Sequence, residues 1–367
     1  MKNKTDILII TTGQGHESLA QVMAEEIIQK TQFSVATFKY FPKVGIHLLL
    51  HRYAPWLMRL LAKPLNNQHF VRLSRLVLKY RFLSLVEAQL SQHRPQVVIS
   101  TFYLLNPAIE ALKAKYNFYF INLITDPKTM ILLNPTPEAD VNLTFDEAQA
   151  TKVKELYPTA KTKVTGWFVK GVFETVYSQK QAKISLKMDP KVPVLLLTSG
   201  SLGNASPAQL LPKLLSLKTP VQIVLICGSN KLLKNLADNF NKSLKKTNQL
   251  VNLRVLGFTK EMDKYIKAAD LVIGKAGPNT LFEAVATKTP FMAIEYGGQQ
   301  EFGNQELIRG YNLGVVENRL DKIWTKLVEF IEQPTILNAF KPDLEKMKTH
   351  NLKAKKILVE ELEKVVI

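Results

Sequence analysis

Short apolar runs alternate with longer segments of helical spacing along most of this chain, and the alternation restricts the folds it can adopt. The short runs are rich in residues that favour strands, whereas the segments between them repeat apolar residues every three or four positions. Strands separated by helices build parallel sheets that are covered by helices. The expected strands are residues 7–12, 33–38, 97–101, 118–124, 141–144 and 162–165, followed by residues 192–198, 221–227, 251–256, 271–274, 290–294 and 314–316.

This alternation is interrupted once. Residues 170–188 are polar and lack a strand signal, and the pattern resumes near Pro193. A chain of 367 residues also exceeds what one hydrophobic core usually supports. We therefore predict an α/β fold of two Rossmann-like parallel-sheet domains that face an interdomain cleft. The predicted parts are residues 1–170, residues 190–345 and a terminal helix over residues 346–367.

The composition is that of an ordinary globular protein, with 46% hydrophobic and 9% aromatic residues, which excludes intrinsic disorder. The apolar run at residues 7–10 is too short for a signal peptide, and no stretch has the roughly 18–20 uncharged apolar residues of a membrane span. The single cysteine, Cys227, permits neither an internal disulfide nor a cysteine-based zinc site. We expect a cytoplasmic protein of soluble architecture that holds no metal.

Positive charge is concentrated in one part of the first half. The net charge is +18, and residues 39–94 hold ten basic residues against the single carboxylate Glu87. Residues 44–92 form a long connection between two strands and are amphipathic, with Trp56 and several leucines near helical spacing beside Arg52. A basic amphipathic helix with Trp and Leu on one face is typical of an interfacial membrane element. The alternative is that these apolar residues face the core of the first domain.

An anionic partner surface could also be nucleic acid. A nucleic-acid binder interleaves aromatic and basic residues on a sheet or in a groove. In this chain lysines and arginines flank leucine-rich helical stretches instead. The pattern favours an anionic membrane surface, and we expect no nucleic-acid partner.

A small-residue turn connects the expected strand at 271–274 with the expected helix at 279–287. Its residues are Lys275, Ala276, Gly277, Pro278, Asn279 and Thr280. Such a turn at a helix N-terminus exposes backbone N–H groups and the positive end of the helix dipole, which suits a diphosphate. Pro278 fits the first helical position, where its missing N–H costs nothing. Many strand–turn–helix junctions contain glycine and proline without binding a ligand, so the surrounding residues decide.

Polar residues follow this turn at two distances. Glu283 lies one turn into the helix, where a carboxylate can accept from two ribose hydroxyls or can simply stabilise the helix dipole. A second glycine-rich turn follows the next strand and carries Gln300, Glu301 and Asn304. Amide and carboxylate side chains can bind several sugar hydroxyls at once, and the alternative role for each is ordinary N-capping.

The first strand ends in a glycine-containing turn that carries Gly13, Gly15 and His16. Histidine is the natural general base near neutral pH, although a histidine in a loop can also be structural. Asp126 lies just past another strand end, where it could orient His16, meet an acceptor or cap a turn. The turn over residues 13–16 fits neither the dinucleotide-binding fingerprint nor a Walker A loop, and no paired histidine and carboxylate spacing suggests a metal site.

Together these residues resemble glycosyltransferase family 28, in particular its diacylglycerol glycosyltransferases and plant-type monogalactosyldiacylglycerol synthases. The motifs that carry the resemblance are residues 275–280 with Glu283, and the glycine-rich turn over residues 298–304. The resemblance implies a GT-B fold whose last helix crosses back onto the first domain. It also implies an inverting transfer that needs no metal or other cofactor and releases UDP.

The resemblance implies a role for each candidate residue. The backbone around Phe258 would meet the uracil, Glu283 the ribose and residues 276–280 the diphosphate. The hexose would contact Gln300, Glu301 and Asn304. His16 would be the base, and the strand-end turns that hold Gly13, Gly15, Gly200 and Ser201 would complete the nucleotide-sugar site.

Three features depart from the family pattern. Gln14 separates Gly13 from Gly15 where the family has a third glycine, and an additional Gln299 precedes Gln300. Residues 127–137 also lack the family's tryptophan.

The predicted function is transfer of a hexose from UDP-glucose or UDP-galactose to diacylglycerol, by an enzyme peripheral on the cytoplasmic face of a membrane. One alternative is transfer of N-acetylglucosamine from its UDP-sugar to an undecaprenyl-linked peptidoglycan precursor. Another is a non-catalytic relative that binds a sugar nucleotide.

Overall fold

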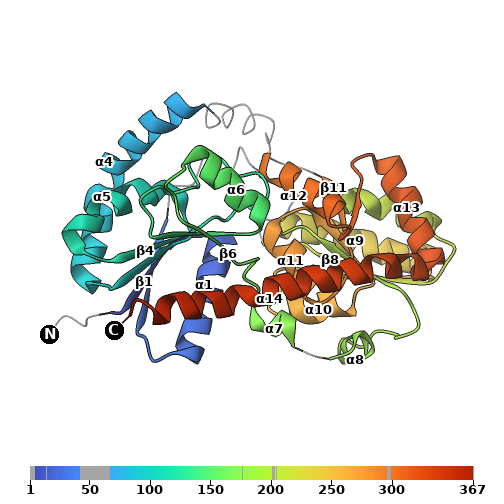
Figure 1. Ribbon diagram of the computed structural model, residues 1–367. Coiled ribbons are helices and arrows are strands. Elements are labelled where there is room, and N and C mark those ends of the chain that lie inside the picture. Colours follow the sequence, from blue (N-terminus) through green and yellow to red (C-terminus); the bar gives the residue numbers. More distant parts are fainter. Residues whose placement is uncertain are drawn as a thin grey trace. The chain divides into compact units, whose positions relative to one another are not determined.

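The computed structural model describes residues 5–13, 15–41, 67–175, 177–200, 203, 205–295 and 299–366, without the side chains of residues 68, 295 and 299–301 (Figure 1). The chain forms two compact units. Unit 1 contains Met1–Phe168 and His350–Ile367, and unit 2 contains Val169–Thr349. The sequence had placed the first division at 170–190 and the second at 346.

Unit 1 contains a parallel sheet, which has six strands in the described part of the chain, in the order β2-β1-β3-β4-β5-β6. Every residue of β1 is buried, as expected for a central strand of a parallel sheet that is covered on both faces. The strands are β1 (Ile7–Thr12), β2 (Val35–Tyr40), β3 (Val97–Ser100), β4 (Tyr119–Leu123), β5 (Val141–Thr144) and β6 (Thr162–Val164).

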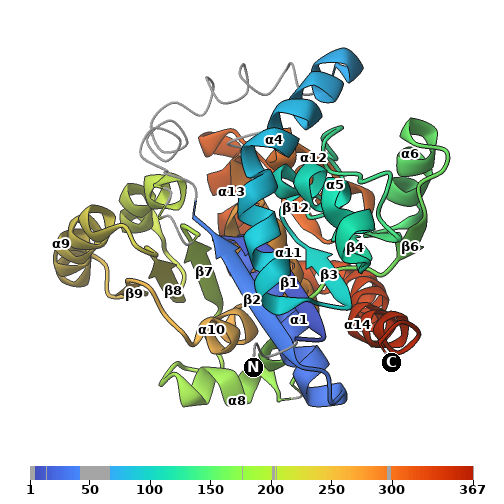
Figure 2. The ribbon, with the colours of Figure 1, turned by 90° about the vertical axis from the view of Figure 1, so that its left-hand side faces the viewer.

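The helices of unit 1 bury apolar stripes against this sheet. Phe82, Val86 and Leu90 of α4 share one core with Ile109 of α5 and with Leu8 of β1. The helices are α1 (Gly15–Lys30), α4 (Gln68–His93), α5 (Asn106–Tyr116) and α6 (Glu147–Leu156), with the short 3-10 helix η2 (Tyr103–Leu105). Figure 2 shows α4 running beside α5.

Local sequence signals set the ends of these helices. The side chain of Asn67 accepts from the first backbone N–H groups of α4, and Asp146 caps α6 in the same way. At their C-terminal ends, Arg94 and Asn117 adopt the left-handed conformation and close α4 and α5. The basic insertion expected at 44–92 is described only from residue 67 onward, where it becomes α4.

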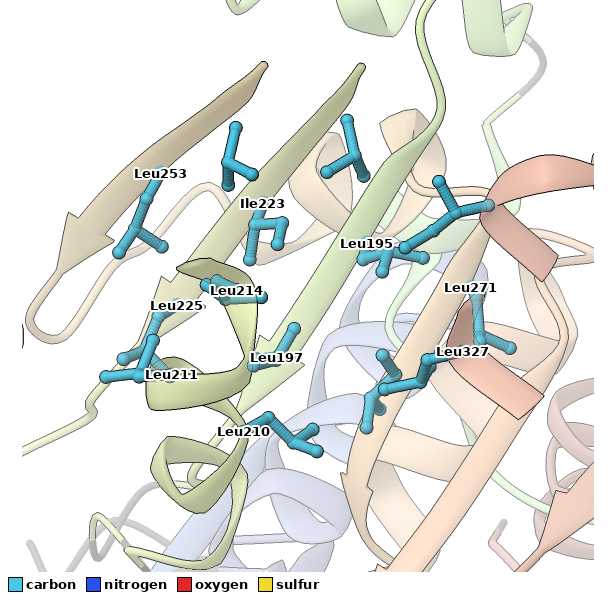
Figure 3. Close-up of a cluster of buried hydrophobic side chains, with 14 of the residues drawn as sticks. Leu195, Leu197, Leu210, Leu211, Leu214, Ile223, Leu225, Leu253, Leu271 and Leu327 are labelled. Atoms are coloured by element: carbon cyan, nitrogen blue, oxygen red, sulfur yellow. The ribbon is translucent and has the colours of Figure 1, made fainter. Parts of the chain in front are cut away.

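Unit 2 repeats the architecture with a parallel sheet in the order β12-β11-β10-β7-β8-β9, again six strands in the described residues. Leucines of β7 and β8 pack with Leu210, Leu211 and Leu214 in the core shown in Figure 3. The strands are β7 (Val194–Thr198), β8 (Val221–Ile226), β9 (Val251–Leu256), β10 (Leu271–Lys275), β11 (Phe291–Glu295) and β12 (Gly314–Val316). The helices are η3 (Ser206–Ser216), α9 (Lys231–Thr247), α10 (Met262–Ala268), α11 (Pro278–Ala286), α12 (Gln299–Gly310), α13 (Leu320–Glu332) and η4 (Pro334–Phe340).

The remaining described helices are the short α7 (Gly171–Glu174) and α8 (Gln179–Ser185) and the long α14 (Lys341–Glu363). The largely buried Lys183 of α8 pairs with Asp270 at 2.8 Å and so attaches α8 to the start of β10. Within unit 1, Asn351 of α14 accepts from the backbone N–H of Trp167 at 3.0 Å. A Cβ on Gly166 would lie 2.9 Å from the carbonyl oxygen of His350, so glycine lets α14 approach this segment.

The predicted α/β class with two parallel sheets is confirmed. The segment between the expected strands at 192–198 and 221–227, which was expected to be helical like the others between strands, forms η3, a 3-10 helix rather than an α-helix. Pro212 lies inside it and cannot donate the backbone hydrogen bond that an α-helix requires there.

Candidate functional site

Each sheet reverses its strand order at one point, and three of the predicted turns follow strands at these two points. In unit 1 the chain leaves β1 for β2 on one side and returns to β3 on the other. In unit 2 the same reversal separates β7 from β10. Open α/β sheets bind ligands outside the carboxyl ends of the strands at such switch points. The turn at 275–280 follows β10, Gly200 follows β7 and His16 follows β1.

The turn after β10 has the geometry of an anion-binding helix start. Gly277 is the N-cap of α11 in an extended conformation, and Pro278 occupies the first turn. The first N–H groups of a helix have no partner within the helix and lie at the positive end of its dipole. A Cβ on Gly277 would meet no atom of the described residues within 4 Å, so these residues leave the space beside the turn open.

Asn304 braces this turn. Its side chain is 1% exposed, and its Nδ2 donates to the carbonyl oxygen of Ala276 at 2.8 Å. Ala276 is itself fully buried. The contact that the structure gives to Asn304 is therefore with the turn, 28 residues away in sequence. A direct contact between Asn304 and a hexose stays a prediction.

Glu283 lies on α11, half-buried and one turn from the open helix end. Burial raises the pKa of its carboxyl to about 8, and the nearby positive charge of Lys170 opposes that rise. Below about pH 8 the side chain is therefore mostly neutral in the protein without ligand. A carboxylate that accepts from two ribose hydroxyls must first lose this proton.

The other predicted residues of unit 2 differ in how far they are described. Phe258 follows β9 and is 71% exposed. Gly200 has a φ of +66°, which an L-residue rarely adopts, and it turns the chain after β7. Ser201 lies outside the described residues, as do the side chains of Gln300 and Glu301. Lys275 is half-buried at the end of β10.

In unit 1, His16 lies at the start of α1, after β1, and contacts the chain that follows the neighbouring strand β3. Its Nδ1 is 2.6 Å from the carbonyl oxygen of Thr101, and its ring meets Phe102 edge-on at 5.5 Å. With Nδ1 donating to that carbonyl, Nε2 is the basic nitrogen. Burial lowers the pKa of His16, so the neutral, proton-accepting imidazole is favoured. A backbone carbonyl, rather than Asp126, thus orients this ring.

Asp126 lies beyond the end of β4 and is 7% exposed. Its Oδ2 accepts from Nδ2 of Asn134 at 2.7 Å, and its carbonyl oxygen accepts from Gln149 at 2.6 Å. The negative charge of Asp126 helps burial to raise the pKa of Tyr103, so the phenol and the carboxyl are neighbours. Tyr103 follows β3 and was missed by the sequence analysis, in which a lone tyrosine after a strand carries no signal.

The glycines of the first turn are partly described. A Cβ on Gly13 would lie 3.9 Å from the side chain of Lys39, and Gly15 begins α1. Lys39 pairs with Glu17 at 2.5 Å beside this turn. Gln14 lies outside the described residues.

No group of three or more histidine, cysteine, aspartate or glutamate side chains among the described residues could hold a metal ion. No helix among those described is long and apolar enough to cross a membrane.

The chain matches one family model and many known proteins. Residues 194–361 match the model described as "Glycosyltransferase family 28 C-terminal domain". The chain is 28% identical over 290 residues to the probable monogalactosyldiacylglycerol synthase 3 of Oryza sativa subsp. japonica, covering 74% of this chain and 53% of the relative. It is 28% identical over 181 residues to the processive diacylglycerol beta-glucosyltransferase of Staphylococcus saprophyticus, covering 49% of this chain and 45% of the relative. The chain thus spans about half the length of the curated relatives that it matches.

Solved structures share the fold over the full length of the chain. The crystal structure of Acinetobacter baumannii MurG superposes with a TM-score of 0.64 at 14% identity, covering 98% of this chain and 99% of that chain. A UDP-glucosyltransferase from Polygonum tinctorium superposes with a TM-score of 0.63 at 11% identity, covering 100% of this chain and 99% of that chain. The GT-B fold expected from the sequence is confirmed.

The pKa of Glu283 leads to a prediction about the binding of UDP. If the ribose hydroxyls need the carboxylate, binding includes the loss of a proton from a group with a pKa of about 8. The affinity for UDP should then rise as the pH increases from about 7 to about 8.5, by up to about tenfold per pH unit. Calorimetric titration at several pH values measures this. In Glu283→Gln the rise should disappear, and an unchanged pH dependence in that variant would contradict the assignment.

Proposed function

From the match of residues 194–361 to the C-terminal domain model of glycosyltransferase family 28, we propose that the chain transfers a hexose from a UDP-sugar to diacylglycerol. The observation that carries the proposal is the open start of α11, braced from behind by Asn304 and followed by Glu283. Backbone N–H groups suit the diphosphate and a carboxyl suits the ribose diol. A helix start without these neighbours would support no more than a general anion site.

The proposed reaction is an in-line displacement at the anomeric carbon. The acceptor hydroxyl oxygen forms a bond to that carbon, and the bond between the carbon and the β-phosphate oxygen breaks. Nε2 of His16 takes the hydroxyl proton, and UDP leaves with the bonding electron pair. Fixed donors at the start of α11 stabilise the charge on the leaving diphosphate, an effect typically worth several kcal/mol.

The acceptor is inferred from the relatives. The rice relative is named a monogalactosyldiacylglycerol synthase and the staphylococcal one a diacylglycerol beta-glucosyltransferase. These names support diacylglycerol over the polyprenyl-linked precursor, because the likeness to MurG is a likeness of fold at 14% identity. The two names also differ in the sugar, so the donor is proposed as UDP-glucose or UDP-galactose.

Membrane contact is proposed through the first half of α4. Its exposed apolar side chains recur at helical spacing and share one face, the α4 stripe: Phe70, Leu73, Leu76, Val77 and Tyr80. Leu73 is 60% and Tyr80 66% exposed, and the exposed Arg72 and Arg81 adjoin them. An apolar helix face beside cations suits an anionic lipid surface. The core-facing alternative holds for the second half of α4 but does not account for this exposed stripe.

The proposed function is tested by its product. The purified chain is incubated with anionic vesicles that contain either diacylglycerol or a polyprenyl-linked acceptor, and with UDP-glucose, UDP-galactose or UDP-N-acetylglucosamine. The lipid products are identified by mass spectrometry. A hexosyl-diacylglycerol supports the proposal. A product with a polyprenyl acceptor and UDP-N-acetylglucosamine supports the alternative transferase. UDP binding without any product supports a non-catalytic relative.

His16→Ala should remove most turnover while leaving the affinity for UDP nearly unchanged. Loss of a general base typically lowers the rate by about 10²–10⁴-fold. Because burial lowers the pKa of His16 from 6.5, the acid limb of the wild-type pH–rate profile should lie below about pH 6.5. His93→Ala is the control, since His93 contacts Thr5 before the start of β1, at the opposite edge of the sheet. Wild-type turnover in His16→Ala would exclude the base.

The α4 stripe should determine binding to vesicles. The double substitution Leu73→Gln and Val77→Gln removes apolar surface that is already exposed, so the melting temperature should change little. Co-sedimentation with anionic vesicles should fall by about tenfold or more. The matched control is Leu232→Gln with Leu236→Gln, two exposed leucines of α9 in unit 2. An equal loss in both variants would contradict a specific role for α4.

A further inference from the structure

Asp126 is held by a buried amide. Nδ2 of Asn134 donates to Oδ2 of Asp126 at 2.7 Å, and Asn134 is 2% exposed. The amide orientation follows from charge, because an amide oxygen turned toward a carboxylate would be repelled. In this orientation Oδ1 of Asn134 is buried and has no hydrogen-bond partner among the described residues. A buried oxygen without a partner is unfavourable, so the contact with Asp126 is maintained against a cost.

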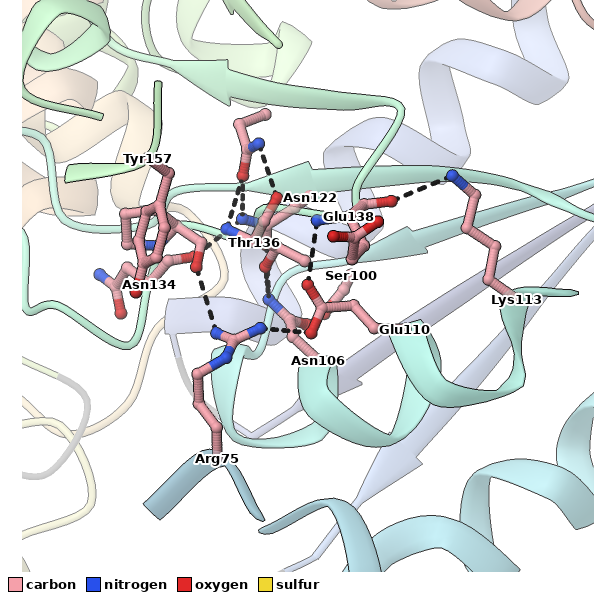
Figure 4. A network of polar contacts seen from close by, with 12 residues as sticks. Arg75, Ser100, Asn106, Glu110, Lys113, Asn122, Asn134, Thr136, Glu138 and Tyr157 are labelled. Atoms are coloured by element: carbon pink, nitrogen blue, oxygen red, sulfur yellow. Dashed lines mark hydrogen bonds and ion pairs between the residues drawn. The ribbon is translucent and has the colours of Figure 1, made fainter. Parts of the chain in front are cut away.

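Asn134 is in turn fixed by a row of buried amides from α5, β4 and β5, of which Figure 4 labels Asn106 and Asn122. Asn122 of β4 donates from Nδ2 to the carbonyl oxygen of Asn134 and to Oδ1 of Asn142 on β5, both at 2.8 Å. Asn106 donates to Asn122 at 2.8 Å and to Thr136 at 2.7 Å. Asn106, Asn122, Asn142 and Thr136 are fully buried. The segment that carries Asn134 is therefore anchored in the sheet rather than loosely placed.

The outer side of the same segment is held from α4. Arg75 donates to the carbonyl oxygen of Pro135 at 3.4 Å and pairs with Glu110 of α5. Glu110 also accepts from the backbone N–H of Glu138 at 3.2 Å. Arg75 lies between Leu73 and Leu76 in the sequence, so it extends from the same helix that carries the α4 stripe. Figure 4 shows Arg75 reaching from this helix toward Asn134 and Glu110.

We propose that Asn134 and Arg75 are positioning residues for Asp126, and that they link α4 to the acceptor end of the reaction. The inference rests on the proposed function and adds to it that Asp126 meets the acceptor hydroxyl, one of the three roles that the sequence left open for this residue. Arg75 fixes the position of the segment from its outer side, and the row of amides fixes it from its inner side. Asn134, which this segment carries, then holds one carboxylate oxygen of Asp126 in place through its hydrogen bond. Neither residue contacts substrate in this scheme. Both act through the location of Asp126.

A double-mutant cycle tests the first step. Asn134→Ala should lower the turnover at saturating donor and acceptor by about tenfold, the effect of losing a hydrogen bond to a charged group, and leave the affinity for UDP unchanged. Asp126→Asn should lower turnover at least as much. If Asn134 acts through Asp126, the double variant should be no slower than Asp126→Asn alone. Losses that multiply in the double variant would overturn the proposal.

A matched pair of cations tests the second step and remains usable if Asn134→Ala does not fold. Lys113 of α5 also reaches this segment, donating to the carbonyl oxygen of Glu138 at 3.0 Å and to Asp140 at 2.8 Å. Arg75→Met and Lys113→Met each remove one cation, one carbonyl contact and one ion pair. Both should lower the melting temperature by a few degrees. Turnover should fall several-fold in Arg75→Met and by less than about twofold in Lys113→Met.

The outcomes separate this inference from the proposed function. If the wild-type chain makes no glycolipid from any UDP-sugar, the proposed function fails. If the wild type is active and the two methionine variants lose turnover equally, or neither loses it, the link from α4 to Asp126 fails while the proposed function stands.

Discussion

Parallel strand pairing is the constraint on which the rest of this chain depends. A parallel pair cannot be closed by a tight turn, so each connection crosses back over the sheet and every strand enters from the same edge. All carboxyl ends then meet at the opposite edge, and residues far apart in sequence become neighbours there. His16 lies beside Thr101, and Ala276 beside Asn304, for this reason. Neither contact follows from local structure alone.

Much of the fold could be predicted from the sequence because strand burial leaves a direct signal. Four of the expected strands, 7–12, 141–144, 251–256 and 314–316, have the bounds found in the structure. The turn at 275–280 could also be predicted, because the preference for glycine and proline at the start of a helix depends only on the local backbone. The 3-10 form of η3 was not predicted, although Pro212 gave a reason to expect it.

The side-chain contacts could not be predicted in the same way. Asn304 was assigned to a sugar by its motif, whereas its nearest described partner is the carbonyl oxygen of Ala276. Asn134 and Tyr103 carried no sequence signal, because their importance depends on the proximity of Asp126 across neighbouring strands. A pattern along one chain records which face a residue occupies. It does not record which residue lies opposite it.

Burial acts in the same direction on the two titrating groups of the proposed reaction, and the consequences are opposite. It disfavours charge on both side chains, so the pKa of His16 falls and that of Glu283 rises to about 8. A neutral imidazole is ready to accept a proton, whereas a neutral carboxyl must give one up before it can hold a ribose diol. Burial therefore leaves the proposed base neutral before any ligand binds. In the proposed site, binding of the donor would release a proton from the carboxyl of Glu283.

The row of buried asparagines raises the question of why the core of unit 1 retains so many amides. Apolar side chains of the same size would fill the space at no cost in hydrogen bonds, and a partly satisfied polar network is worse than an apolar core. Amides become favourable when one geometry must be specified, because each donor and acceptor accepts few arrangements. Asn106 at the start of α5 donates to Asn122 of β4, which donates in turn to Asn142 of β5. The same amides bind the hydroxyl of Thr136 and the carbonyl oxygen of Asn134. The unpartnered Oδ1 of Asn134 marks the end of that row. What the row specifies is therefore the direction of the remaining Asn134 donor, which points at Asp126.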